Sequence, residues 1–115
     1  MTPDINVLIA AFRSDHVHHS IAKRWIDAAI QACVAGARFD VLPMVIAGFL
    51  RLVTNRKVFP DPTPIERAVE FIERLLSRPG VAAAVHASDG HLVTFDRAFK
   101  RLLGKRELTI LSTAR

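Results

Sequence analysis

Residues 3–12 read PDINVLIAAF and residues 92–96 read LVTFD, and these two apolar runs decide the fold. Each run carries one carboxylate, Asp4 near the start of the first and Asp96 at the end of the second. We interpret the start of the chain and residues 92–95 as short strands, which places both aspartates at the carboxyl ends of strands. In open α/β sheets that end faces the crevice where ligands bind. Two carboxylates that converge there repel one another unless a cation joins them, so the pattern predicts a divalent-cation site.

Between and after these runs the sequence alternates predicted helices with further short strands. Apolar spacing predicts helices over residues 7–12, 17–33, 43–53, 64–76, 81–87 and 97–103, and strands over residues 39–42 and 108–111. Strands that alternate with helices indicate an α/β domain with a parallel sheet flanked by helices. At 115 residues the chain is expected to form one domain, residues 1–115.

Capping residues and apolar spacing predict where the helices begin and which sides are buried. Asn6 is expected to open the first helix, and Ser14 and Asp15 to cap the second. Thr63 is expected to cap the helix that follows it, with Pro64 in the first turn. The predicted buried stripes are Val17, Ile21, Trp25, Ala29 and Cys33; Met44, Ala47, Leu50 and Leu52 or Val53; and Ile65, Val69, Ile72 and Leu76.

The overall composition predicts a cytoplasmic globular domain with a basic end. Half of the residues are hydrophobic, and no apolar stretch approaches the ~20 residues of a membrane span. A single cysteine, Cys33, excludes an internal disulfide and suits a reducing cytoplasm, and no signal-peptide pattern opens the chain. The net charge is +5, and residues 96–115 hold six bases and two acids. Such a tail attracts RNA or an acidic partner, although a solvated basic surface explains the charge equally well.

The residues around the two aspartates fit a magnesium site. Magnesium prefers oxygen ligands and keeps several waters, which can attack phosphorus or stabilise a leaving oxygen. Asp4 is therefore a candidate ligand, and Asn6 a candidate donor that aims it. A plainer interpretation is that Asp4 and Asn6 only cap a helix, and that Asp96 caps the helix beginning at Arg97. Asp89 precedes the strand that Asp96 follows, so it lies at the opposite rim of the sheet and is interpreted as a turn residue.

Other chemistries find no support in the sequence. His16, His18 and His19 lack the i, i+4 spacing or the cysteine partners of zinc sites, so they are interpreted as an exposed helix start. The five glycines are scattered, which excludes a glycine-rich phosphate loop. No serine–histidine–aspartate arrangement has a strand–turn–helix context.

Four stretches together resemble a PIN domain, and in particular the VapC-type toxin ribonucleases of bacterial toxin–antitoxin pairs. They are residues 3–9, residues 15–19 leading to Trp25, residues 47–55 with 58–59, and residues 92–99. The resemblance implies an α/β/α sandwich with a central parallel sheet and a cluster of acids that binds Mg²⁺ or Mn²⁺. It also implies RNA cleavage, a homodimer and inhibition by a small VapB-like antitoxin.

The resemblance also assigns roles to individual residues. Asp4 matches the first acid of the family and Asp96 its last, so these two would hold the metal and carry catalysis. Asn6 matches the polar residue two positions beyond the first acid. Thr94 matches the hydroxyl residue before the last acid, and both would orient the ligands.

Two acids of the family have no match in this chain. The second, a glutamate in the helix after the second strand, would fall at Ile46 or Gly48, and residues 44–51 contain no acid. The third normally begins the helix before residues 92–94, whereas here residues 80–81 run directly into an alanine-rich stretch. We therefore expect an internal deletion of one strand–helix segment.

Three functions remain open on the sequence alone. The first is a magnesium-dependent endoribonuclease of the toxin type, in which Arg51, Arg97 or the tail bases grip RNA phosphates. The second is a catalytically degenerate PIN-like protein that binds an antitoxin or RNA without cleavage. The third is an unrelated small basic α/β module that binds nucleic acid and has no need of Asp4.

Overall fold

A computed structural model describes residues 1–83, 91–97 and 108–111. In these ranges the strands are β1 (Thr2–Pro3), β2 (Phe39–Val41), β3 (Val81–Ala83), β4 (Leu92–Thr94) and β5 (Leu108–Ile110). The described pairings are all parallel, in one sheet of order β1-β4-β5 and a second of order β2-β3. The backbone N–H of Asp40 donates to the carbonyl of Met1 at 2.9 Å, which joins the two sheets edge to edge.

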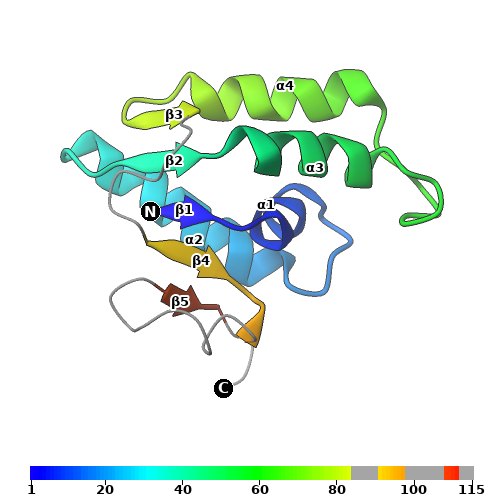
Figure 1. Cartoon of the computed structure of the whole chain (residues 1–115), viewed down its shortest axis with the longest axis horizontal. Helices are drawn as coiled ribbons and strands as arrows, with labels where there is room; N and C mark the ends of the chain where they lie inside the picture. The colour runs from blue at the N-terminus through cyan, green and yellow to red at the C-terminus, as the bar shows by residue number, and fades with distance from the viewer. Residues whose placement is uncertain (84–90, 98–107, 112–115) are drawn as a thin grey trace.

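The strands run side by side in the order β3, β2, β1, β4, β5, with their arrows pointing the same way (Figure 1). The helices of the described ranges are α1 (Ile5–Phe12), α2 (His19–Val34), α3 (Pro43–Val53) and α4 (Ile65–Leu76). The predicted α/β class with a parallel sheet is therefore confirmed. Both α1 and α3 extend away from the carboxyl ends of the strands that precede them, β1 and β2 (Figure 1).

Helix α1 lies at the centre of the core. Five consecutive residues, 7–11, are buried in it, and the helix contacts both α2 and α3. A helix that is apolar all round is typical of a buried element, because every side faces protein. This packing fixes the amino end of α1, where Asp4 lies.

Helix α2 begins later than predicted. Its N-cap is His18, whereas Ser14 and Asp15 lie in the preceding loop, so their prediction as caps was wrong. The physical reason is that the Asp15 carboxylate is taken by Arg13, at 2.7 Å. Val17 is 83% exposed, and Ile21 and Trp25 are only half-buried. The buried residues of α2 are Ala22, Ile26, Ala29 and Cys33.

The buried sides of α3 and α4 agree with the predicted ones only in part, at Val53 and Ile72. Met44 is 83% exposed, and Ile65 and Val69 are 47% and 36% exposed. The buried residues are Gly48, Phe49 and Val53 in α3, and Ala68, Ile72 and Leu75 in α4. Small residues such as Gly48 and Ala68 mark the sides where neighbouring elements come closest, whereas the prediction followed the large apolar residues.

Residues 81–83 form a strand where a helix was predicted over 81–87, and that prediction was wrong for the described part. Val81 pairs with Phe39, and the next two residues continue the parallel register along β2. The ladder outweighs the helix preference of alanine, which is a weak effect that tertiary contacts override. Residues 84–87, and all but the first residue of the helix predicted over 97–103, lie outside the described ranges.

The remaining predicted strands are confirmed to within a residue at each end. None of the helices in the described ranges is long and apolar enough to cross a lipid bilayer.

Candidate active site

Asp4 and Thr94 meet at the carboxyl ends of two neighbouring strands. The parallel register of β1 and β4 sets Pro3 beside Val93, so the next residues of both strands emerge together. The Asp4 backbone N–H donates to the Val93 carbonyl at 2.7 Å, and Thr94 Oγ1 donates to Asp4 Oδ2 at 2.8 Å. Thr94 is fully buried, so its hydroxyl forms hydrogen bonds with these protein neighbours and not with solvent.

Asn6 connects the same two residues from α1. Its amide Nδ2 lies 3.4 Å from Asp4 Oδ2 and 3.1 Å from Thr94 Oγ1. Its Oδ1 accepts the backbone N–H of Phe95 at 3.3 Å. The Thr94 hydroxyl has one hydrogen to donate, and the 2.8 Å distance from its Oγ1 to Asp4 Oδ2 assigns that hydrogen to the Asp4 carboxylate. Asn6 therefore lies where it can donate to Asp4, and its role in aiming a metal ligand stays a prediction.

Asp4 is also the N-cap of α1, because its Oδ1 accepts the Ile5 backbone N–H at 2.7 Å. Helix α1 therefore begins at Ile5, and Asn6 lies inside the helix instead of opening it as predicted. Capping and metal binding are not exclusive. A carboxylate offers about four acceptor sites, and three donors approach this one. Capacity for one further ligand remains on Asp4.

Asp96 reaches the site through Thr94. The Asp96 backbone N–H donates to Thr94 Oγ1 at 3.0 Å, so one hydroxyl contacts the Asp4 carboxylate and the Asp96 main chain. Asp96 and the following Arg97 are exposed. The structure thus brings together the side chains of Asp4, Asn6 and Thr94, and Asp96 joins them through its main chain.

Arg51 is not part of this cluster. It is exposed in the last turn of α3, and α3 runs away from the carboxyl end of β2 (Figure 1). Eight residues of helix separate it from Pro43, a rise of about 12 Å. Asp89 lies outside the described ranges.

At Gly48, one of the two positions expected for the unmatched family glutamate, an apolar side chain lies close by. A Cβ built on Gly48 would lie 2.5 Å from Cδ1 of Ile5, the residue next to Asp4. Position 48 therefore faces the amino end of α1, and the Ile5 side chain occupies the room that a longer side chain there would need. Among the described residues no group of three or more histidines, cysteines or acids could hold a metal ion.

Sequence reasoning missed the contribution of the histidines beside this site. The His18 ring stacks on Phe95 with centroids 4.6 Å apart and planes 21° apart. His16 and His19 are likewise partly buried, so the prediction that these histidines are exposed was wrong, although α2 does begin at His19. Burial is the main cause that lowers the pKa of His16, and the nearby His18 adds to it. No sequence spacing signals a stack between residues so far apart in the chain.

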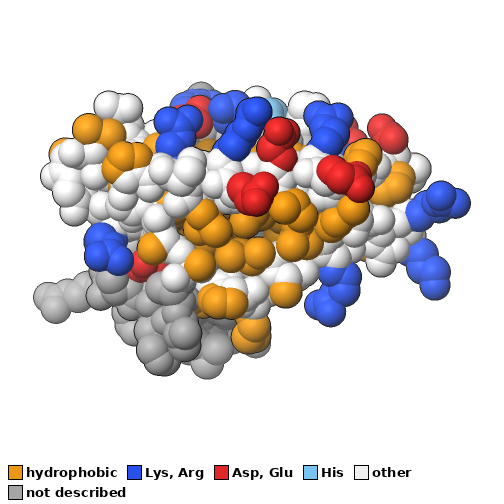
Figure 2. Space-filling view, turned by 90° about the horizontal axis from the view of Figure 1, so that it is seen from above, with side chains coloured by type: hydrophobic (Ala, Val, Ile, Leu, Met, Phe, Trp, Pro, Cys, Tyr) orange, Lys and Arg blue, Asp and Glu red, His pale blue; other side chains and the backbone are white. Residues whose placement is uncertain are grey.

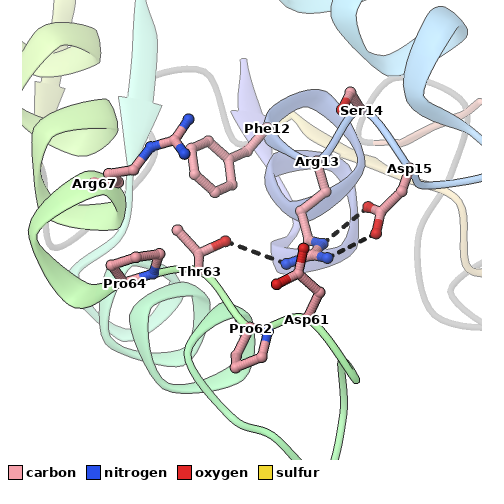
Figure 3. A pocket seen from close by; sticks show the side chains of 9 residues that line it. All are labelled: Phe12, Arg13, Ser14, Asp15, Asp61, Pro62, Thr63, Pro64 and Arg67. Atoms are coloured by element: carbon pink, nitrogen blue, oxygen red, sulfur yellow. Dashed lines mark hydrogen bonds and ion pairs between the residues drawn. The ribbon is translucent and has the colours of Figure 1, made fainter.

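A hollow at the other end of α1 is organised around Arg13 (Figure 3). The Arg13 guanidinium binds both Asp15 oxygens, at 2.9 and 2.7 Å, and donates to Thr63 Oγ1 at 3.2 Å. It also lies 4.1 Å above the ring of Phe59. These donations lower the pKa of Asp15 and raise that of Arg13.

Arg13 therefore acts as a structural clasp between two loops. Thr63 serves this clasp instead of capping α4, whose N-cap is Pro64, so the predicted cap was wrong. Because Arg13 is only 8% exposed and each of its three guanidinium nitrogens donates to Asp15 or Thr63, we assign the hollow a structural role.

The sequence of the chain is similar to those of several known proteins. The chain is 41% identical over 76 residues to ribonuclease VapC31 and to ribonuclease VapC25 of Mycobacterium tuberculosis. It is 30% identical over 92 residues to VapC ribonuclease Mb2897 of Mycobacterium bovis. No protein-family profile matches the chain.

The relatives are longer than this chain. The 76 residues matched in VapC31 are 66% of this chain and 51% of the relative, and the 92 residues matched in Mb2897 are 80% and 60%. The chain thus spans about half the length of the curated relatives it matches.

Proposed function

We propose that this chain, a homologue of the VapC-type ribonucleases with a PIN-like α/β fold, cleaves RNA as the toxin of a toxin–antitoxin pair. The observation that carries the proposal is the Thr94 hydroxyl, which joins the Asp4 carboxylate to the Asp96 main chain at adjacent strand ends. This is the edge of a parallel sheet where ligands bind. The homology removes the interpretation as an unrelated basic module.

The donor chemistry of the site fits Mg²⁺, with Mn²⁺ as an alternative. Magnesium is commonly bound by one or two carboxylates, with water and substrate phosphates completing its ligands. Asp4 and Asp96 would supply the two carboxylates. When bound, the cation would lower the pKa of an attacking water and offset charge on the phosphate.

The protein's own part is to position these groups. Asn6 and Thr94 hold the Asp4 carboxylate in one orientation, since both donate toward the same oxygen, Oδ2. Arg97 follows Asp96 directly and is exposed, so it is placed to bind an RNA phosphate near the site. Arg51 would act at a greater distance, along the path of a longer RNA.

The test is RNA cleavage by Asp4→Asn and Asp96→Asn proteins with added Mg²⁺. Each change keeps the size of the side chain and removes a charged ligand, so we expect cleavage to fall by at least about 100-fold. Asp27→Asn is the matched control, because Asp27 is an exposed acid on α2 whose partner is Lys23. Cleavage that persists in both site variants would exclude this mechanism.

A second candidate is a degenerate PIN-like protein that binds an antitoxin or RNA without cutting it. The observation in its favour is the absence of a third acid near Asp4 within the described residues. Calorimetric titration with Mg²⁺ separates the two candidates. Saturable binding at millimolar concentrations or below, lost in Asp4→Asn, supports the nuclease, and no binding supports the degenerate protein.

A VapB-like antitoxin and a second copy of this chain are the partners that we propose, in the cytoplasm. The supporting feature is the exposure of large apolar residues on α3 and α4, which include Met44, Ile65 and Val69. Figure 2 shows hydrophobic side chains gathered beside acidic ones on the face seen from above. Large exposed apolar surface is typical of interaction sites. Light scattering of the purified chain would measure whether it forms a dimer.

A further inference from the structure

We propose that His18 is a positioning residue of the acid site, whose ring, stacked on Phe95, holds the turn that carries Asp96 against Asn6. Its importance for catalysis rests on the proposed function. Its effect on the turn follows from the contacts around Phe95 and can be measured without metal or RNA.

The turn after β4 is held by side chains. Strand β4 ends at Thr94, and the next two amides no longer belong to the ladder. The Phe95 N–H donates to Asn6 Oδ1 at 3.3 Å, and the Asp96 N–H donates to Thr94 Oγ1 at 3.0 Å. The Phe95 bond is longer than the usual N–H···O distance of about 2.9–3.0 Å, so what packs against Phe95 also helps to hold the turn that carries Asp96.

His18 packs against Phe95 in a geometry that favours attraction. The rings lie 4.6 Å apart and 21° from parallel, and such aromatic pairs stabilise beyond the area they bury. His18 is the N-cap residue of α2, yet its side chain makes no capping hydrogen bond. Serine, threonine or aspartate would cap better at this position. The side chain is directed to Phe95 instead.

The His18 ring also leaves one polar atom unsatisfied. Its Nδ1 is buried and has no hydrogen-bond partner among the described residues. Buried polar atoms without partners are rare and ask for an explanation. The stack on Phe95 explains the missing partner, because the orientation in which the His18 ring covers Phe95 also buries Nδ1.

The loop that carries His18 is itself tied to α1. The His18 backbone N–H donates to His16 Nδ1 at 3.0 Å, and His19 Nδ1 lies 2.8 Å from the carbonyl of Ala10. Ala10 belongs to α1, the helix that Asp4 caps and Asn6 joins. The same helix therefore holds the turn twice, through Asn6 directly and through His18 and Phe95.

Removal of the His18 ring should make Asp96 more mobile and leave Asp4 unchanged. Asp4 is held by the Ile5 amide and the Thr94 hydroxyl, neither of which contacts His18 in the described contacts. Asp96 is held through the turn. His18 should thus affect how well Asp96 joins Asp4 in binding one cation.

The first experiment is amide hydrogen exchange on the metal-free protein. In His18→Ala we expect the Phe95 and Asp96 amides to exchange about three- to tenfold faster, which corresponds to the loss of one aromatic pair. The Asp4 amide, which donates to the Val93 carbonyl, should be unchanged.

Two further variants separate the stack from other effects. His18→Phe keeps a flat ring and removes the unsatisfied nitrogen, so its exchange should match the wild type. Val17→Ala is the matched control, since Val17 is in the same loop and 83% exposed. If His18→Ala does not fold, Phe95→Leu removes the other ring of the stack. It should accelerate hydrogen exchange of the Asp96 amide to the extent expected for His18→Ala.

Mn²⁺ affinity gives the second readout. His18→Ala and Phe95→Leu should each weaken it about three- to tenfold, and the double variant little more than either, because both remove one interaction. Unchanged exchange at Phe95 and Asp96 in the single variants would overturn the proposal even if RNA is cleaved. Faster exchange in a protein whose wild type neither binds metal nor cuts RNA would uphold the positioning and reject the nuclease.

Discussion

Replacement of Thr94 by valine keeps the shape of the side chain and removes its hydroxyl. The Asp4 carboxylate then loses a donor and the Asp96 amide loses its acceptor, inside a fully buried position. We expect a loss of about 1–3 kcal/mol in the free energy of unfolding, together with weaker RNA cleavage. Urea denaturation measures the change in stability. Thr94→Ser, which retains the hydroxyl, should restore cleavage, and a cleavage-competent valine variant would contradict the role assigned to Thr94.

The positions of Asp4, Asn6, Thr94 and Asp96 could be predicted from the sequence, because strand ends and the family pattern both point to them. His18 could not be predicted, since only the tertiary fold brings its ring to Phe95. Arg13 was missed for a similar reason: the sequence around its partner Thr63 is typical of a helix cap.

The Arg13–Asp15 clasp predicts a dependence of stability on pH. The Arg13 guanidinium lowers the pKa of Asp15 in the folded state. The folded state therefore favours the ionised carboxylate more strongly than the unfolded state does. The stabilisation is therefore present above the ordinary carboxyl pKa of about 4 and is lost as the pH falls through the lowered folded value. The difference in urea midpoint between wild type and Asp15→Asn should be clear at pH 7 and shrink as the pH falls below the ordinary carboxyl pKa of about 4. A difference that stays constant with pH would show that charge is not its cause.

At the scale of elements, the sequence predicts which helices and strands exist better than which sides they bury. Ala22 and Ala68 are fully buried, whereas the larger Met44 and Val17 are each 83% exposed. Alanine and glycine allow close approach of a neighbour, and their partners are known only once the chain has folded. Strand β3 illustrates the same limit, because an alanine-rich stretch became a strand through its pairing with β2.

The contact between α1 and α3 offers a test of the missing acid. Gly48→Glu alone should force the Ile5 side chain to move, because its Cβ would meet Ile5 Cδ1 at 2.5 Å. Combined with Ile5→Ala, which makes room, the glutamate would add a carboxylate near Asp4. We expect Mg²⁺ affinity to rise at least about tenfold by calorimetry, since charge count tunes such sites. Ile5→Ala with Gly48→Gln is the control, and equal affinity in both proteins would place position 48 outside the site.

At the scale of the whole molecule, the connection between β3 and β4 is short. These parallel strands lie on opposite sides of β1 and β2, and residues 84–91 alone join them. Parallel strands are usually joined by a dozen or more residues, often with a helix. Together with the greater length of VapC31 and Mb2897, this agrees with the expected internal deletion, which stays a prediction.

The central claim is that Asp4 and Asp96 hold one cation between them. The most direct measurement is NMR of the isotope-labelled chain during titration with Mn²⁺, whose paramagnetism broadens nearby amides. The account predicts that the amides around Asp4 and those around Asp96 broaden together, with one saturation curve, and that Asp4→Asn or Asp96→Asn abolishes both effects. Broadening at only one aspartate, or none at either, would contradict it.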